Sequence, residues 1–163
     1  MKANIKHIIY KIVLLTTLAM TLSGCAGVKK LKEMKVVSYK IESIKPHGLR
    51  NYTAIISAKI DNPGTKLDVY DVWAEINKDG QMICKITSEG FGLAPNCVDT
   101  YKIPVNLEVS NNVTILGLGI LLGKGMVGCD ISYFAKLKAK GFAPVKMKGQ
   151  NIPISELKTK FGI

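Results

Sequence analysis

The sequence predicts an all-β protein: two antiparallel sheets packed as a β-sandwich of the immunoglobulin or fibronectin type III kind, with about seven strands and one short helix. Three observations predict this class. Apolar and polar residues alternate in seven short segments between residues 35 and 148, turn residues separate the segments, and one glycine-rich apolar segment breaks the alternation. Residues 1–24 have the pattern of an export signal and stand apart from the fold.

The alternating segments are typical of strands with one buried face, because successive side chains of a strand point to opposite sides of the sheet. Trp73 interrupts the third segment. The residues expected to face the core are Val37, Tyr39, Ile41, Ala54, Ile56, Ala58, Ile60, Tyr70, Val72, Ala74, Ile76, Met82, Cys84, Ile86, Tyr101, Ile103, Val105, Leu107, Val109, Ile131, Tyr133, Ala135, Leu137, Ala139, Val145 and Met147.

Turn residues separate the segments. They stand at Pro46-His47-Gly48, Asn62-Pro63-Gly64, Asp79-Gly80, Ala94-Pro95-Asn96 and 141–144. Asp-Gly suits the positive φ angles of a tight hairpin turn, so the third and fourth strands should form a hairpin. Pro104 has no N–H to donate, so its strand should be an edge or lack a neighbour on one side there.

The segment from Asn111 to Val127 combines large apolar residues with four glycines. Asn111 or Asn112 can cap a short helix there, and Gly123 can end it. We interpret the segment as a helix that covers one end of the core. A segment that contacts lipid is the alternative. A nucleotide-binding loop is excluded, because Gly117-x-Gly119 lacks the third glycine of that motif.

The N-terminus is basic and then apolar. Three lysines and no acid precede the apolar run 12–22, which is too short to cross a bilayer, since a spanning helix needs about 20 residues. This pattern predicts a secretory signal. An ordinary signal peptide followed by a chance cysteine is one alternative.

The run ends in Leu22-Ser23-Gly24-Cys25, which resembles the bacterial lipobox. The resemblance implies cleavage between Gly24 and Cys25, a diacylglycerol on the Cys25 thiol and an acyl chain such as palmitate on the new amino group. The chain then divides into a signal peptide (1–24), a lipidated Cys with a short basic tether (25–35), the sandwich domain (36–155) and a tail (156–163). Ala26 and Gly27 lack the acidic retention signal, so we expect the periplasmic face of an outer membrane in a two-membrane host.

The mature chain is basic at its ends. Its formal charge is +8, the whole-chain value of +11 less three signal lysines, divided as +6 over 25–60, −4 over 61–108 and +6 over 109–163. The tether carries Lys29, Lys30, Lys32 and Lys35. These lysines can attract an anionic bilayer by about 1 kcal/mol each, or they can serve as a solvated linker.

The sequence offers no catalytic or metal-binding pattern, so we expect neither an enzyme nor a cofactor. His47 is the one histidine left after the signal, too few for a zinc site or a supported nucleophile. With Cys25 lipidated, Cys84, Cys97 and Cys129 remain, and an odd number leaves at least one thiol unpaired.

Several short motifs resemble the type 2 late-embryogenesis-abundant (LEA2, water-stress and hypersensitive-response) family. They are Ile60-Asp61-Asn62-Pro63, Trp73, Asp79-Gly80, Tyr101-Lys102-Ile103-Pro104-Val105 and Asp130-Ile131-Ser132-Tyr133. The resemblance spans about residues 35–155 and implies a fibronectin-like sandwich with a short helix and no catalytic residues. Bacterial members are often lipoproteins, with proposed roles in desiccation protection and lipid contact.

Five lysines form the predicted binding surface. Lys136, Lys138 and Lys140 alternate in one strand, and Lys146 and Lys148 in its neighbour, so all five can share one face. Like charges directly opposite each other destabilise a sheet unless an acid or an anion compensates. We therefore expect a lipid-anchored envelope protein that contacts anionic lipid or an envelope protein, not nucleic acid; a stress protectant without a specific ligand is the alternative.

Overall fold

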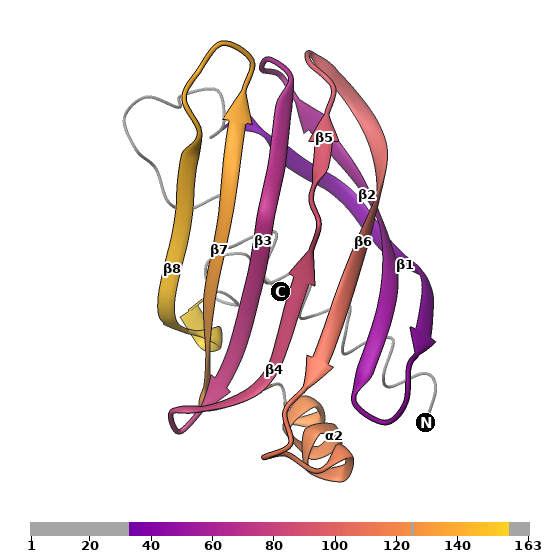
Figure 1. The fold of residues 1–163 in the computed structure, drawn as a ribbon, viewed down its shortest axis with the longest axis vertical. Coiled ribbons are helices and arrows are strands. Elements are labelled where there is room, and N and C mark those ends of the chain that lie inside the picture. Colours follow the sequence, from indigo (N-terminus) through magenta and orange to yellow (C-terminus); the bar gives the residue numbers. More distant parts are fainter. Residues whose placement is uncertain (1–32, 125, 157–163) are drawn as a thin grey trace.

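The computed structural model describes residues 33–124 and 126–156 (Figure 1). The signal segment, Cys25 and most of the tail lie outside the described residues, so lipidation at Cys25 and cleavage after Gly24 stay predictions. The described helix is too short to span a bilayer.

The described residues form eight strands, one helix and a short helical turn at 154–156 after β8, which confirms the all-β class. The strands and the helix are β1 (Lys35–Pro46), β2 (Asn51–Asn62), β3 (Leu67–Lys78), β4 (Gln81–Ser88), β5 (Phe91–Leu93), β6 (Cys97–Val109), α2 (Ile115–Gly123), β7 (Cys129–Ala139) and β8 (Val145–Pro153). The strand beyond the expected seven is β5, whose three residues are too short to show an alternation. Asp79 and Gly80 both have positive φ, as expected of the β3–β4 hairpin turn.

Every strand pairing is antiparallel, and the hydrogen-bonded order is β1-β2-β6-β4-β3-β7-β8, with β5 paired to β3. The sandwich is therefore one sheet folded over itself rather than two separate sheets, and β4 joins the layers by pairing with both β3 and β6. Figure 1 shows β1 and β2 passing behind β5 and β3. The β4–β6 pairing ends at Asn106, so Pro104 has a strand neighbour on one side only, as expected.

One hydrophobic cluster fills the space between the layers. Ile76, Ile131 and Ala135 are fully inaccessible, and side chains from β2 through β8 contribute to the cluster. The cluster lies entirely within residues 54–154, with Met34 packed at its margin.

Three register shifts correct the expected inward faces. Between Val36 and Ser38 the β1–β2 register shifts, and Val37, expected to face the core, is 55% exposed. At Asp71, with φ of 52°, the β3–β7 register shifts, so Tyr70 faces outward opposite Lys136 instead of joining Val72 on the core side. Near Ile83, a shift in the β3–β4 register buries Ile83 and leaves Met82 half-buried. A bulge inserts one residue and so reverses the alternation on one side of it.

The helix α2 begins later than expected. The Thr114 hydroxyl accepts a hydrogen bond from the Gly117 N–H at 2.9 Å, so Thr114, not Asn111 or Asn112, caps the helix. Leu118 and Leu121 pack against the core, which agrees with a covering helix, whereas Leu116 is 78% exposed.

The domain has two distinct ends (Figure 1). The hairpin end holds the start of β1, the 63–66 loop and the 140–144 turn. Lys35 at the start of β1 pairs with Asp61 before the loop, and Leu67 after the loop pairs with Ala139 before the turn. The helix end holds the 47–50 and 79–80 turns and residues 110–128. There the Arg50 guanidinium donates hydrogen bonds to the carbonyls of Ser110 and Val113.

Candidate binding surfaces

The structure brings the five predicted lysines to the β7–β8 hairpin, but it does not leave them equivalent. Lys136 lies directly opposite Lys146 in the register. The Lys136 ammonium donates to Asp71 Oδ2 at 2.6 Å and lies 5.8 Å from the centre of the Tyr70 ring. The hydrogen bond to Asp71 raises the pKa of Lys136. Asp71 is thus the compensating acid for the opposed lysines, and the β3 bulge presents it.

The other four lysines form the exposed part of this surface. Lys138, Lys140, Lys146 and Lys148 are solvent-exposed and make no ion pair with any residue of 33–124 or 126–156. We call these four the hairpin lysines. They are the part of the predicted site that remains available to an anionic partner.

Aromatic side chains lie beside the hairpin lysines. Phe134 stands opposite Lys148, and its ring stacks on Trp73 with centroids 6.2 Å apart and planes 16° apart. Phe142, in the turn between β7 and β8, is 68% exposed. Sequence reasoning missed Phe142, although an aromatic residue in a turn flanked by lysines is a usable signal for an interfacial contact.

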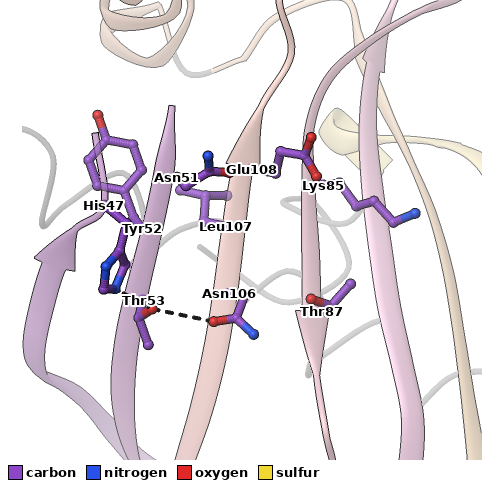
Figure 2. Close-up of a pocket in the computed structure, with 9 residues that line it drawn as sticks. All are labelled: His47, Asn51, Tyr52, Thr53, Lys85, Thr87, Asn106, Leu107 and Glu108. Carbon is purple, nitrogen blue, oxygen red and sulfur yellow. Dashed lines mark hydrogen bonds between the residues drawn. The ribbon is translucent and has the colours of Figure 1, made fainter. Parts of the chain in front are cut away.

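A second surface is a shallow polar groove of about 350 Å³ on the outer face of β2, β6 and β4 (Figure 2). Its lining residues are His47, Asn51, Tyr52, Thr53, Lys85, Thr87, Asn106, Leu107 and Glu108. The His47 Nε2 atom lies 2.9 Å from Thr53 Oγ1, which in turn lies 3.4 Å from Asn106 Oδ1. Sequence reasoning did not find this groove, because its strands are neighbours only in the folded sheet.

A third surface is apolar and lies at the helix end. Leu49, Leu116, Ile120 and Val127 are all at least half exposed there. Leu49 lies at the same end of the domain as α2, because its neighbour Arg50 is bonded to the chain that precedes the helix. This is the segment for which lipid contact was the alternative interpretation.

Cys84 and Cys129 lie near each other in the core, whereas Cys97 and His47 lie elsewhere in the fold. Cys84 and Cys129 are buried free thiols, and burial is the main reason that the pKa of Cys84 rises to about 12, with Cys129 a smaller contribution. A thiol held protonated in this way is a packing residue rather than a nucleophile. Cys97 is half-buried, with its sulfur 3.6 Å from the Ala94 carbonyl. Among the described residues, no cluster of side chains could hold a metal ion.

No family model matches the sequence, and no curated protein matches it. The LEA2 resemblance therefore rests on the motifs alone. Solved structures with a similar arrangement include a protein from Archaeoglobus fulgidus (10% identity, TM-score 0.43, covering 71% of this chain and 94% of that one).

Two further similar structures come from cell envelopes. One is a conjugative transposon lipoprotein from Bacteroides eggerthii, with 8% identity and a TM-score of 0.25 over 68% of this chain and 92% of that one. The other is the archaellum periplasmic stator protein FlaG from Sulfolobus acidocaldarius, with 10% identity and a TM-score of 0.26 over 69% and 98%. At these scores they carry no functional argument.

Proposed function

We propose that this protein is a non-enzymatic, lipid-anchored domain of the cell envelope that rests its hairpin end on an anionic membrane surface. The observation that carries the proposal is where the chain enters the fold. Lys35, the first residue of β1, pairs with Asp61, and the following 63–66 loop meets the end of β7 through the bond from the Lys140 N–H to the Lys66 carbonyl. The expected tether thus leads to the end from which the β7–β8 hairpin projects.

The length of the tether supports this orientation. Residues 25–34 can extend at most about 35 Å, whereas β1, with 12 residues, is about 40 Å long. A lipid on Cys25 therefore keeps the hairpin end within about 35 Å of the bilayer, close enough for its lysines to reach the surface. We propose the periplasmic face of an outer membrane as the location, because Ala26 and Gly27 lack the acidic retention signal.

The chemistry of the hairpin end suits an anionic surface. The hairpin lysines are exposed and unpaired among the described residues, and each such charge near an anionic bilayer adds about 1 kcal/mol of attraction. Phe142 adds an exposed apolar ring of the kind that inserts into the interface of a bilayer. The LEA2 resemblance also favours a binding domain without catalytic residues.

Sedimentation with vesicles tests the proposal. The chain from residue 26, made without the lipid, is mixed with vesicles of phosphatidylcholine alone or with added phosphatidylglycerol. We expect binding only to the anionic vesicles, weakening with salt. Replacing Lys138, Lys140, Lys146 and Lys148 by Gln should weaken it by about tenfold or more, because up to about 1 kcal/mol is lost per charge.

A matched variant with Lys40, Lys45, Lys78 and Lys124 changed to Gln loses the same charge elsewhere. It should bind nearly as well as the unchanged chain. If both variants lose binding equally, the attraction comes from net charge and not from the hairpin end, and the proposed orientation is wrong. If neither loses binding, the hairpin lysines do not contact lipid.

A further inference from the structure

The polar groove is a regular grid of hydrogen-bonding side chains. Thr53, Asn106 and Thr87 form one row across β2, β6 and β4, since Thr53 pairs with Asn106 and Asn106 pairs with Thr87 in the strand registers. Asn51, Glu108 and Lys85 form the next row in the same way. Neighbouring strands lie about 4.8 Å apart, so each row presents three polar groups at nearly even spacing on a rigid surface.

A hydrogen-bonded chain fixes how the first row is presented. With the ring proton of His47 on Nε2, the imidazole donates to Thr53 Oγ1, whose hydroxyl then donates to Asn106 Oδ1. The carbonyl oxygen of the Asn106 amide is therefore occupied, and its NH₂ group points away from Thr53 (Figure 2). The turn that carries His47 is itself held by the bond from the His47 N–H to the Asn51 carbonyl at 2.7 Å.

Much of the hydrogen-bonding capacity of this grid is unused. The side chains of Asn51 and Thr87, the NH₂ group of Asn106 and the carboxylate of Glu108 have no partner among residues 33–124 and 126–156. Lys85 is held by Glu75 at 3.6 Å, on the side away from β6. The groove therefore offers both hydrogen-bond donors and acceptors. Its lysine, Lys85, is already paired with Glu75.

We propose that the groove binds a carbohydrate chain. Sugar hydroxyls both donate and accept hydrogen bonds, as the Thr and Asn side chains do, and Glu108 can accept from a pair of them. A phosphate would face the Glu108 carboxylate, and an acyl chain would leave polar groups without partners. The volume of about 350 Å³ lies at the lower end of the 300–1,000 Å³ typical of small-ligand sites.

The place of the groove suits a glycan in the envelope. Asn51, Glu108 and Lys85 lie at the helix end of their strands, next to the bond between Arg50 and Ser110. With the hairpin end toward the membrane, this part of the groove lies at the end of the domain farther from the bilayer. Carbohydrate binding depends on the grid alone, however, and does not require the proposed membrane contact.

Nuclear magnetic resonance titration tests the inference. The ¹⁵N-labelled chain from residue 26 is titrated with soluble tetramers of β-linked N-acetylglucosamine, of β-linked glucose and of α-linked glucose. We expect at least one sugar to shift the amide signals of Asn51, Thr53, Thr87 and Asn106 with a dissociation constant of about 1 mM or tighter. The double variant Thr87→Ala, Asn106→Ala should weaken this binding about tenfold or more, with a spectrum that otherwise stays folded.

The matched control changes the same residue types outside the groove, as Thr100→Ala, Asn111→Ala, both at exposed positions. This control should bind the sugar as the unchanged chain does. The inference is overturned if none of the three sugars shifts the groove signals, if the shifts map to another surface, or if both double variants weaken binding equally. None of these outcomes depends on vesicle binding, so the two proposals fail separately.

Discussion

At the scale of single residues, the hydrogen bonds of Asn62 explain why an asparagine stands in the Asn-Pro motif. Its side chain is 97% buried and bonds three backbone groups: it donates to the carbonyls of Thr65 and Ala94 and accepts from the Gly64 N–H. These bonds tie the β2–β3 loop to the segment between β5 and β6. The asparagine of the Asn-Pro motif is therefore a structural residue at the hairpin end rather than a ligand-binding one.

Replacing this residue should destabilise the domain strongly. Asn62→Ala removes the partner of the buried Gly64 N–H and of the Thr65 and Ala94 carbonyls, which belong to exposed residues, and a buried group left without a partner costs about 1–3 kcal/mol. We expect the free energy of unfolding to fall by about 2 kcal/mol or more, measured by urea denaturation followed by tryptophan fluorescence. Asn111→Ala, at an exposed position, should change it by less than about 0.5 kcal/mol. A loss at Asn62 as small as this would contradict the assigned role.

At the scale of elements, the edge strand β8 depends on one glycine. Gly149 pairs with Tyr133 across the β7–β8 register, and the Tyr133 ring, which is 2% exposed, lies against the glycine backbone. A Cβ atom at position 149 would come within 2.3 Å of Tyr133 Cε1 and 2.6 Å of Ile152 Cδ1. A buried aromatic ring packed over a glycine fixes the register of the β7–β8 pair.

An added methyl group at this position should therefore weaken the hairpin. Gly149→Ala forces Tyr133 to move within a packed core, which costs about 1–3 kcal/mol, and we expect a lower melting temperature by circular dichroism. The control is Gly123→Ala, at the end of α2, where a Cβ atom would meet nothing within 4 Å. It should be neutral or stabilising, because alanine favours a helix over glycine by about 1 kcal/mol. Equal melting temperatures for both variants would refute the packing argument.

At the scale of the whole molecule, the two ends of the sandwich differ in chemistry. The hairpin end gathers the start of β1, Phe142 and the exposed hairpin lysines, whereas the helix end gathers Leu49, Leu116, Ile120 and Val127. The strands that separate them are up to 13 residues long. A domain held at one end by a lipid should thus present its other end to the surroundings.

Fluorescence quenching in vesicles tests this orientation on the lipidated full-length protein. A dye attached at Phe142→Cys or at Leu116→Cys, each with Cys97→Ser to remove the accessible native thiol, reports its distance from brominated lipid. We expect strong quenching at position 142 and little at position 116, because the exposed hairpin lysines are proposed to rest on the bilayer and α2 lies at the other end of the domain. Stronger quenching at position 116 would show that the apolar helix end, not the hairpin end, lies in the membrane.

The sequence by itself determined the all-β class, most of the inward-facing residues and the β3–β4 turn. These are local features: a strand alternates its faces every two residues, and Asp79-Gly80 adopts positive φ angles without help from distant residues. The sequence also placed the five lysines on one hairpin, because two adjacent alternating segments form a hairpin whatever the rest of the sheet does.

The strand neighbours and the register shifts could not be predicted from the sequence and are seen only in the folded structure. The bulge at Asp71 turned Tyr70 outward and placed an acid on Lys136, and the pairing of β4 with both β3 and β6 made one folded sheet from two expected ones. The groove exists because β2, β6 and β4 lie side by side, although Thr53 and Asn106 are 53 residues apart. Such pairings depend on the packing of the whole core, so a local sequence pattern does not predict them.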